Sequence, residues 1–234
     1  MLKKSLTCII FAAVLMINCA ASEAFSVKNI SFSLRTTPVP RYDNDTSRAR
    51  SGSKNRWLRL NVDFVPAEKK SGEAWYDDVT MEGMLVISRG DKEKSYVVLT
   101  GETRFFTIPA DKKDHIGVFY VPPMLLSRYC GDSAGALKAL QMFRVAFYGP
   151  GRVLLGEGYW AVSGKNGQFV PAGTKAFKAV AARMKEYEKA YSNVTLLRGG
   201  LYSKEKTPWV YFDYDFYDLI YDNFRSQAGE SIKK

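Results

Sequence analysis

The stretch that decides the fold runs from Val79 to Val121 and reads VTMEGMLVISRGDKEKSYVVLTGETRFFTIPADKKDHIGVFYV. It contains four apolar runs of strand length, rich in β-branched and aromatic residues: Val79–Arg89, Ser95–Thr100, Glu102–Ile108 and His115–Val121. Charged segments interrupt the stretch at residues 90–94 and 111–114, as solvated hairpin turns require. The pattern predicts an antiparallel meander that supplies a hydrophobic core.

Further strands are predicted on both sides of this stretch. Phe25–Leu34 has one apolar face and predicts a first strand at a sheet edge, and Trp57–Val65 alternates apolar and polar residues with a period of two. Gln141–Tyr148 and Val153–Ser163 predict a hairpin around a turn of glycine, proline and glycine at 149–151. The eight predicted strands, with few helices between them, indicate a mainly β fold, an immunoglobulin-like antiparallel β-sandwich.

Two segments have helical patterns. Met124–Cys130 follows a pair of prolines and predicts a short helical turn at one end of the sandwich, which glycines break at 131–135. Later, Thr174 can cap a longer amphipathic helix. Its apolar residues have helical spacing and lie on one face, which we expect to pack on the sandwich: Phe177, Val180, Met184, Tyr187 and Tyr191.

We therefore predict three segments. Residues 1–24 form a signal peptide, 25–163 form the β-sandwich core, and 164–234 form a C-terminal helix and extended segment that pack on the sandwich. The extended segment includes an aromatic-rich stretch at 211–221 in which aspartates are interleaved. Residues 36–55 carry prolines and a charged turn in place of core residues, which predicts a long loop.

The N-terminus has the order of a secretory signal peptide: two lysines, an apolar run at 9–17, and small residues up to Ala24. Cleavage after Ala24 would begin the mature chain at Phe25. The apolar run is shorter than the roughly 20 residues of a spanning helix, so we expect no transmembrane helix in the mature chain. A lipid on Cys19 is an alternative, for which Asn18 is an unfavourable preceding residue. We predict an exported protein of the periplasm or outer cell surface.

Composition limits the kinds of partner. With 46% hydrophobic residues, the 234-residue chain can build a sizeable core. The net charge of +10 favours acidic partners such as sulfated or sialylated glycans, anionic lipid head groups or an acidic protein face, and we predict no nucleic-acid partner. A dispersed, solvated surface is the alternative, because the main basic cluster is small: Arg48, Arg50, Lys54 and Arg56.

The sequence predicts no catalytic, cofactor-binding or metal-binding set of residues. His115 and Cys130 are the only histidine and the only cysteine of the predicted mature chain. They cannot supply the four ligands of a structural zinc site, and neither has the local signature of a nucleophile or base. A lone Cys130 forms no intramolecular disulfide and is expected to be a small buried residue. Asp213 and Asp215 could bind calcium, but solvent-facing carboxylates opposite buried aromatics explain them better.

Two other kinds of site depend on the fold. A glycoside hydrolase needs two carboxylates about 5 to 10 Å apart, and the sequence does not single out a pair. Glu157 and Asp63 are no better than other acidic residues. A sugar-stacking platform could use the four tryptophans, although tryptophans in a sandwich more often pack in the core or at an edge: Trp57, Trp75, Trp160 and Trp209.

Several fragments together resemble a known family: Arg56–Phe64, Trp75–Asp78 leading into Met81–Ile87, and Lys204–Trp209 followed by Asp215–Tyr217. The sequence is similar to exported verrucomicrobial pilus-like proteins, which are encoded in gene clusters with type IV pilus components. The resemblance covers most of the mature chain and includes no catalytic motif. It implies an immunoglobulin-like β-sandwich, similar to the head of some archaeal pilins, with a structural or surface-interaction role and no enzymatic activity.

One feature separates this chain from a usual type IV pilin. A pilin keeps its apolar N-terminal segment as the helix that packs the filament, whereas this chain would lose its apolar run on cleavage. We therefore expect a non-enzymatic, pilus-associated envelope protein that works through an envelope partner or through self-association. The alternatives are a carbohydrate-binding module for acidic or mucin-type glycans and a hydrolase with carboxylates in a cleft.

Overall fold

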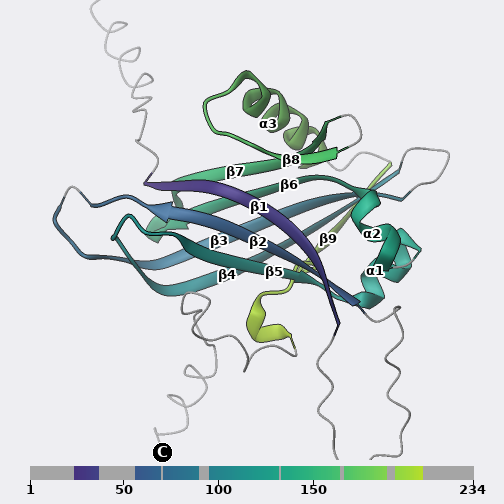
Figure 1. The fold of residues 1–234 in the computed structure, drawn as a ribbon, viewed down its shortest axis with the longest axis horizontal. Helices are drawn as coiled ribbons and strands as arrows, with labels where there is room; N and C mark the ends of the chain where they lie inside the picture. Colours follow the sequence, from purple (N-terminus) through teal and green to yellow (C-terminus); the bar gives the residue numbers. More distant parts are fainter. Residues whose placement is uncertain are drawn as a thin grey trace, which may run out of the picture.

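Two β-sheets lie face to face in the computed structural model, with one long helix against the outside of the larger sheet (Figure 1). The structure describes residues 24–36, 56–69, 71–89, 95–131, 133–163, 166–188 and 193–207. This arrangement confirms the predicted mainly β sandwich and its helix near the C-terminus. The immunoglobulin-like character of the sandwich stays a prediction. The predicted signal peptide up to residue 23, most of the predicted loop and the aromatic-rich stretch lie outside the described residues.

The smaller sheet has three antiparallel strands. They are β1 (Phe25–Thr36), β2 (Arg56–Pro66) and β5 (His115–Val121), in the order β1-β2-β5. The edge position predicted for the first strand is therefore confirmed. The predicted period of two in β2 is also confirmed, because its alternate apolar side chains are fully buried between the sheets: Leu58, Leu60, Val62 and Phe64.

The larger sheet has six strands, in the order β8-β7-β6-β3-β4-β9. Neighbouring strands are antiparallel except for the edge strand β9, which runs parallel to β4. The bounds are β3 (Trp75–Ser88), β4 (Tyr96–Pro109), β6 (Leu140–Gly149), β7 (Val153–Ser163), β8 (Asn166–Val170) and β9 (Val194–Arg198).

The predicted meander is wrong in its fourth strand. β3 and β4 form the expected hairpin, but β5 leaves this sheet and pairs with β2 in the other one. Gly117 shows why β5 can lie across β3: a Cβ atom at this position would be only 2.6 Å from Sδ of Met81 on β3. The missing side chain lets Met81 pack against the β5 backbone, so the two strands face each other across the core.

The predicted division into two strands, Ser95–Thr100 and Glu102–Ile108, is also wrong, because β4 is one continuous strand through Gly101. The described residues before 164 form seven strands instead of the eight predicted. Gly101 lies opposite Gly83 in the β3–β4 register, and Leu201 packs on this glycine pair. A Cβ atom at Gly101 would be 2.1 Å from the carbonyl oxygen of Leu201. This glycine is therefore explained by a close approach of another chain segment.

Two short elements were not predicted. The helical turn after the prolines is confirmed as α1 (Pro123–Cys130), but the expected break after it contains the start of a second helix, α2 (Ser133–Ala139). β8 (Asn166–Val170) lies at the start of the segment for which a helix and an extended stretch, but no strand of the sheet, were predicted. Both helices lie at one end of the sandwich (Figure 1).

Both sides of the sandwich are closed by backbone contacts. On one side β1 crosses β7 so closely that a Cβ atom at Gly156 would be 2.0 Å from the carbonyl oxygen of Phe25. On the other side the chain after β9 joins the sheets, because Leu201 N–H donates to the Thr100 carbonyl and Tyr202 pairs with Tyr120 of β5. The contacts of Leu201 and Tyr202 fix the position of β9 relative to the core.

The helix α3 (Lys175–Glu188) covers part of the outer face of the larger sheet. The predicted cap is confirmed, since the Phe177 backbone N–H donates to Thr174 Oγ1 at 3.0 Å. Val180 and Met184 are buried in a second apolar cluster between α3 and the sheet. In the described part of the chain, no helix is long and apolar enough to cross a membrane.

Candidate functional site

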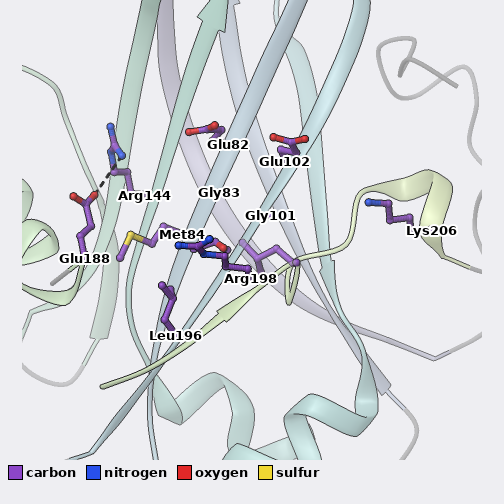
Figure 2. Close-up of a pocket in the computed structure, with 13 residues that line it drawn as sticks. Glu82, Gly83, Met84, Gly101, Glu102, Arg144, Glu188, Leu196, Arg198 and Lys206 are labelled. Atoms are coloured by element: carbon purple, nitrogen blue, oxygen red, sulfur yellow. Dashed lines mark ion pairs between the residues drawn. The ribbon is translucent and has the colours of Figure 1, made fainter. Parts of the chain in front are cut away.

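The outer face of the larger sheet is hollowed where α3 stops covering it. A groove of about 540 Å³ lies between the last turn of α3, strand β9 and the outward side chains of β3, β4 and β6 (Figure 2). Met84 and Thr100 contribute to its floor, and Leu196 contributes an exposed apolar side chain from β9. Most of the remaining lining is charged, which is unusual for the middle of a sheet.

Arg144 on β6 closes the helix side of the groove. Its guanidinium is 3.2 Å from Glu157 of β7 and 3.6 Å from Glu188 in the last turn of α3. The Tyr159 hydroxyl donates to the same Glu157 carboxylate at 3.0 Å. Burial acts to lower the pKa of Arg144, but Tyr159, Tyr148 and Glu157 outweigh burial and raise it, so the guanidinium stays charged. The network holds the end of α3 on the sheet.

Glu82 and Glu102 are direct cross-strand neighbours in the β3–β4 register. Like charges in this position destabilise a sheet unless a cation lies nearby. Arg152 forms the ion pair with Glu82, and this hydrogen bond raises the pKa of Arg152. Arg152 thus already binds the Glu82 carboxylate in this cross-strand pair, and a hydrolase function stays a prediction.

The β9 side of the groove is basic. Arg198 of β9 and Lys206 line the groove, and both are exposed (Figure 2). Neither forms an ion pair with another residue that the structure describes, whereas Arg144 is already neutralised by Glu157 and Glu188. This end of the groove can therefore attract an anionic group.

Among the described strands, β9 lies at the end of its sheet and pairs on one side only. The Asn193 carbonyl accepts a hydrogen bond from Tyr96 N–H at 2.9 Å, so the backbone groups of 195 and 197 face β4 by the alternation of a strand. The N–H groups of Val194, Leu196 and Arg198 face the opposite way and have no strand partner within the described ranges. β9 contains no proline or bulge that would discourage the addition of another strand.

The structure does not bring His115 and Cys130 together. His115 begins β5 and lies 3.1 Å from Asp111, whereas Cys130 ends α1, which follows the other end of that strand. Burial acts to raise the pKa of Asp111, but hydrogen bonds from Lys113 N–H and from His115 outweigh it and hold this pKa below its ordinary value. Cys130 is half-buried.

The tryptophans do not form one platform. Trp160 is buried against Phe32, Trp57 packs half-buried against Tyr120 and Tyr202, and only Trp75 of the three described tryptophans is exposed, at 51%. Trp209 lies outside the described residues.

The acidic candidates are also separated. Asp63 on β2 accepts a hydrogen bond from Asn29 on the outside of the smaller sheet, while Glu157 lies on the outside of the larger one. Asp213 and Asp215 fall outside the described residues. Among the residues that the structure does describe, no group of three or more histidine, cysteine or acidic side chains could hold a metal ion.

Sequence reasoning missed the groove itself. A signal for it exists, because Glu82, Glu102 and Arg144 place charges in the middle of long strands, in phase with the side chains that face away from the sandwich core. The groove also needs walls from β9 and α3, which come from distant parts of the chain, so no local pattern predicts it.

The fold and this surface define a two-sheet sandwich protein with a charged groove beside an open sheet edge. A family model matches residues 18–224, and the chain belongs to this verrucomicrobial pilus-like family. A crystal structure of a protein from Akkermansia muciniphila is similar to it, with a TM-score of 0.63 and 17% identity, over 85% of this chain and 93% of that chain. At this identity the likeness shows the fold alone. No curated protein matches the sequence.

Proposed function

We propose that this protein is a non-enzymatic, exported protein of the cell envelope that works through contacts with other proteins in a pilus-like system. The observation that carries the proposal is the family match over residues 18–224. Export is supported by the signal-peptide pattern of the first 24 residues. The role is a structural or interaction role, and no reaction is assigned.

The groove and the β9 edge are the surface that fits such a role best. An open edge offers unpaired backbone groups to an extended partner, and the groove beside it offers side-chain contacts that can select the partner. Arg198 and Lys206 favour a partner segment that carries carboxylates. Glycan binding stays a prediction, for which exposed Trp75 is the described tryptophan best placed to stack on a sugar.

A pull-down from native envelope extract tests this function. The bait is the tagged chain as wild type, with the groove charges reversed (Arg198→Glu and Lys206→Glu), or with two exposed lysines of α3 reversed as a control (Lys178→Glu and Lys185→Glu). We expect the wild type and the control to recover the same envelope protein, and the groove variant to recover about tenfold less, because a charge-assisted contact becomes repulsive. Failure of the wild type to recover a specific envelope protein would contradict the proposal.

A further inference from the structure

The open edge of β9 raises the question of what covers it. Three backbone N–H groups, those of Val194, Leu196 and Arg198, point away from β4 in a row, and no described strand accepts from them. Leu196 is 38% exposed on the groove side. On the core side, Leu197 packs only partly buried against the main apolar cluster. An added strand would satisfy the N–H groups and cover both leucines.

The charges beside the edge specify the chemistry of that strand. Arg198 and Lys206 form the basic end of the groove and have no described ion-pair partner. A strand that fits should carry carboxylates on the side that faces the groove. Its other side should be apolar, because that side would meet Leu197 and extend the core.

Residues 211–221, which we call the aromatic-acidic segment, have this chemistry. They read YFDYDFYDLIY, with three aspartates and no basic residue. In an extended conformation Phe212, Tyr214 and Phe216 share one side, and Asp213 and Asp215 share the other. The family match ends at residue 224, so it includes this segment and leaves out the last ten residues.

The same chain can deliver the segment to the edge. Lys206 already lines the groove, and Thr207 ends the described chain beside it. Only residues 208–210 separate Thr207 from the aromatic-acidic segment. Extended chain advances about 3.3 Å per residue, so this connection spans up to about 13 Å. Such a short tether gives the segment a high effective concentration at its own edge.

We propose that the aromatic-acidic segment of the same chain adds as a further strand to the edge of β9 that no described strand pairs with, with Asp213 and Asp215 toward Arg198 and Lys206. The same-chain strand adds to the proposed function, and only the statement about a partner protein rests on that function. A partner that uses this edge must present the same alternation of aromatic and acidic residues and must displace the segment. The segment thereby also protects an edge that would otherwise promote aggregation.

Hydrogen exchange measured by mass spectrometry on the purified full chain tests the proposal. The variants are Phe216→Pro, which removes a backbone donor from the added strand, and Ala228→Pro, a control in the last ten residues. In the wild type and the control, we expect slow exchange in the peptide that covers 194–198. In Phe216→Pro this exchange should be at least about tenfold faster. Unchanged protection of β3 and β6 shows that each variant is folded.

Equal exchange of 194–198 in the wild type and in folded Phe216→Pro would overturn the proposal. Protection that increases with protein concentration would overturn the same-chain assignment and would show that a second copy supplies the strand. Replacing both Asp213 and Asp215 by asparagine should remove part of the protection of 194–198 from exchange. Added salt should lower this protection in the wild type by a similar amount, because it screens the same charges. These measurements contain no envelope partner, so their failure leaves the pull-down result unaffected.

Discussion

Replacing Gly156 with alanine is expected to lower the free energy of unfolding by about 3 kcal/mol or more. The new Cβ atom would lie 2.0 Å from the carbonyl oxygen of Phe25, far inside contact distance. Because the obstacle is backbone and not the end of a flexible side chain, β1 itself must move away from β7. That movement opens one closed side of the sandwich and disturbs the packing of Phe25, which is fully buried.

Gly149→Ala is the matched control, because this glycine lies in the same β6–β7 hairpin. A Cβ atom there would meet only Leu155 at 3.5 Å, an ordinary contact distance. We expect its stability to stay within about 0.5 kcal/mol of the wild type. Urea unfolding followed by tryptophan fluorescence compares the two variants. Equal stability of Gly156→Ala and Gly149→Ala would contradict the close crossing of β1 and β7.

Phe64→Ala is expected to cost about 3 to 5 kcal/mol of stability. Phe64 is fully buried at the centre of an aromatic cluster, with its ring centroid 4.6 Å from Phe147 and 5.5 Å from Phe25. Phe105 and His115 also lie against it. Truncation removes contacts with both sheets and leaves a cavity that the rigid strands cannot close. The loss is a large part of the roughly 5–15 kcal/mol that stabilises a typical domain.

Phe106→Ala is the control, because it removes a phenylalanine side chain that is exposed instead of buried. Phe106 is the neighbour of Phe105 on β4 and is 62% exposed. We expect its replacement to change stability by at most about 1 kcal/mol. The same unfolding measurement applies to both variants. A Phe64→Ala protein that unfolds at the urea concentration of Phe106→Ala would show that the aromatic cluster does not hold the sheets together.

Local patterns predicted most strands but not their partners. The alternation in β2 and the bounds of β5 follow from residue types, because one buried face imposes a period of two. Pairing is a property of distant residues. β5 can join the smaller sheet because the missing side chain of Gly117 leaves room for Met81 of the larger sheet. No pattern within β5 shows this contact. Gly101 looked like a break because its reason for being small, Leu201, comes a hundred residues later.

The candidate site was harder to predict than the fold. Glu82 and Glu102 become neighbours only through the β3–β4 register, and β9 reaches them through parallel pairing after α3. The local sequence of β9 indicates a short apolar run and nothing about its place at an edge. The aromatic-acidic segment, in contrast, was recognisable from sequence, because its alternation is strict over several residues.

The predicted signal-peptide cleavage site adjoins the first strand. The Ala24 carbonyl accepts a hydrogen bond from Ala67 N–H at 2.7 Å, and Phe25 is fully buried. A protease that cut after Ala24 would need this segment extended and accessible. Export followed by cleavage before β1 pairs with β2 satisfies that requirement.

Photo-cross-linking in living cells tests whether the groove and the β9 edge contact other proteins. A photoreactive residue replaces Leu196 at the edge or, as a control, Lys178 on the exposed side of α3. We expect irradiation at position 196 to join the chain to one defined envelope protein, which displaces the aromatic-acidic segment from the β9 edge, and we expect no such product at position 178. Identical, diffuse background at both positions would contradict this expectation.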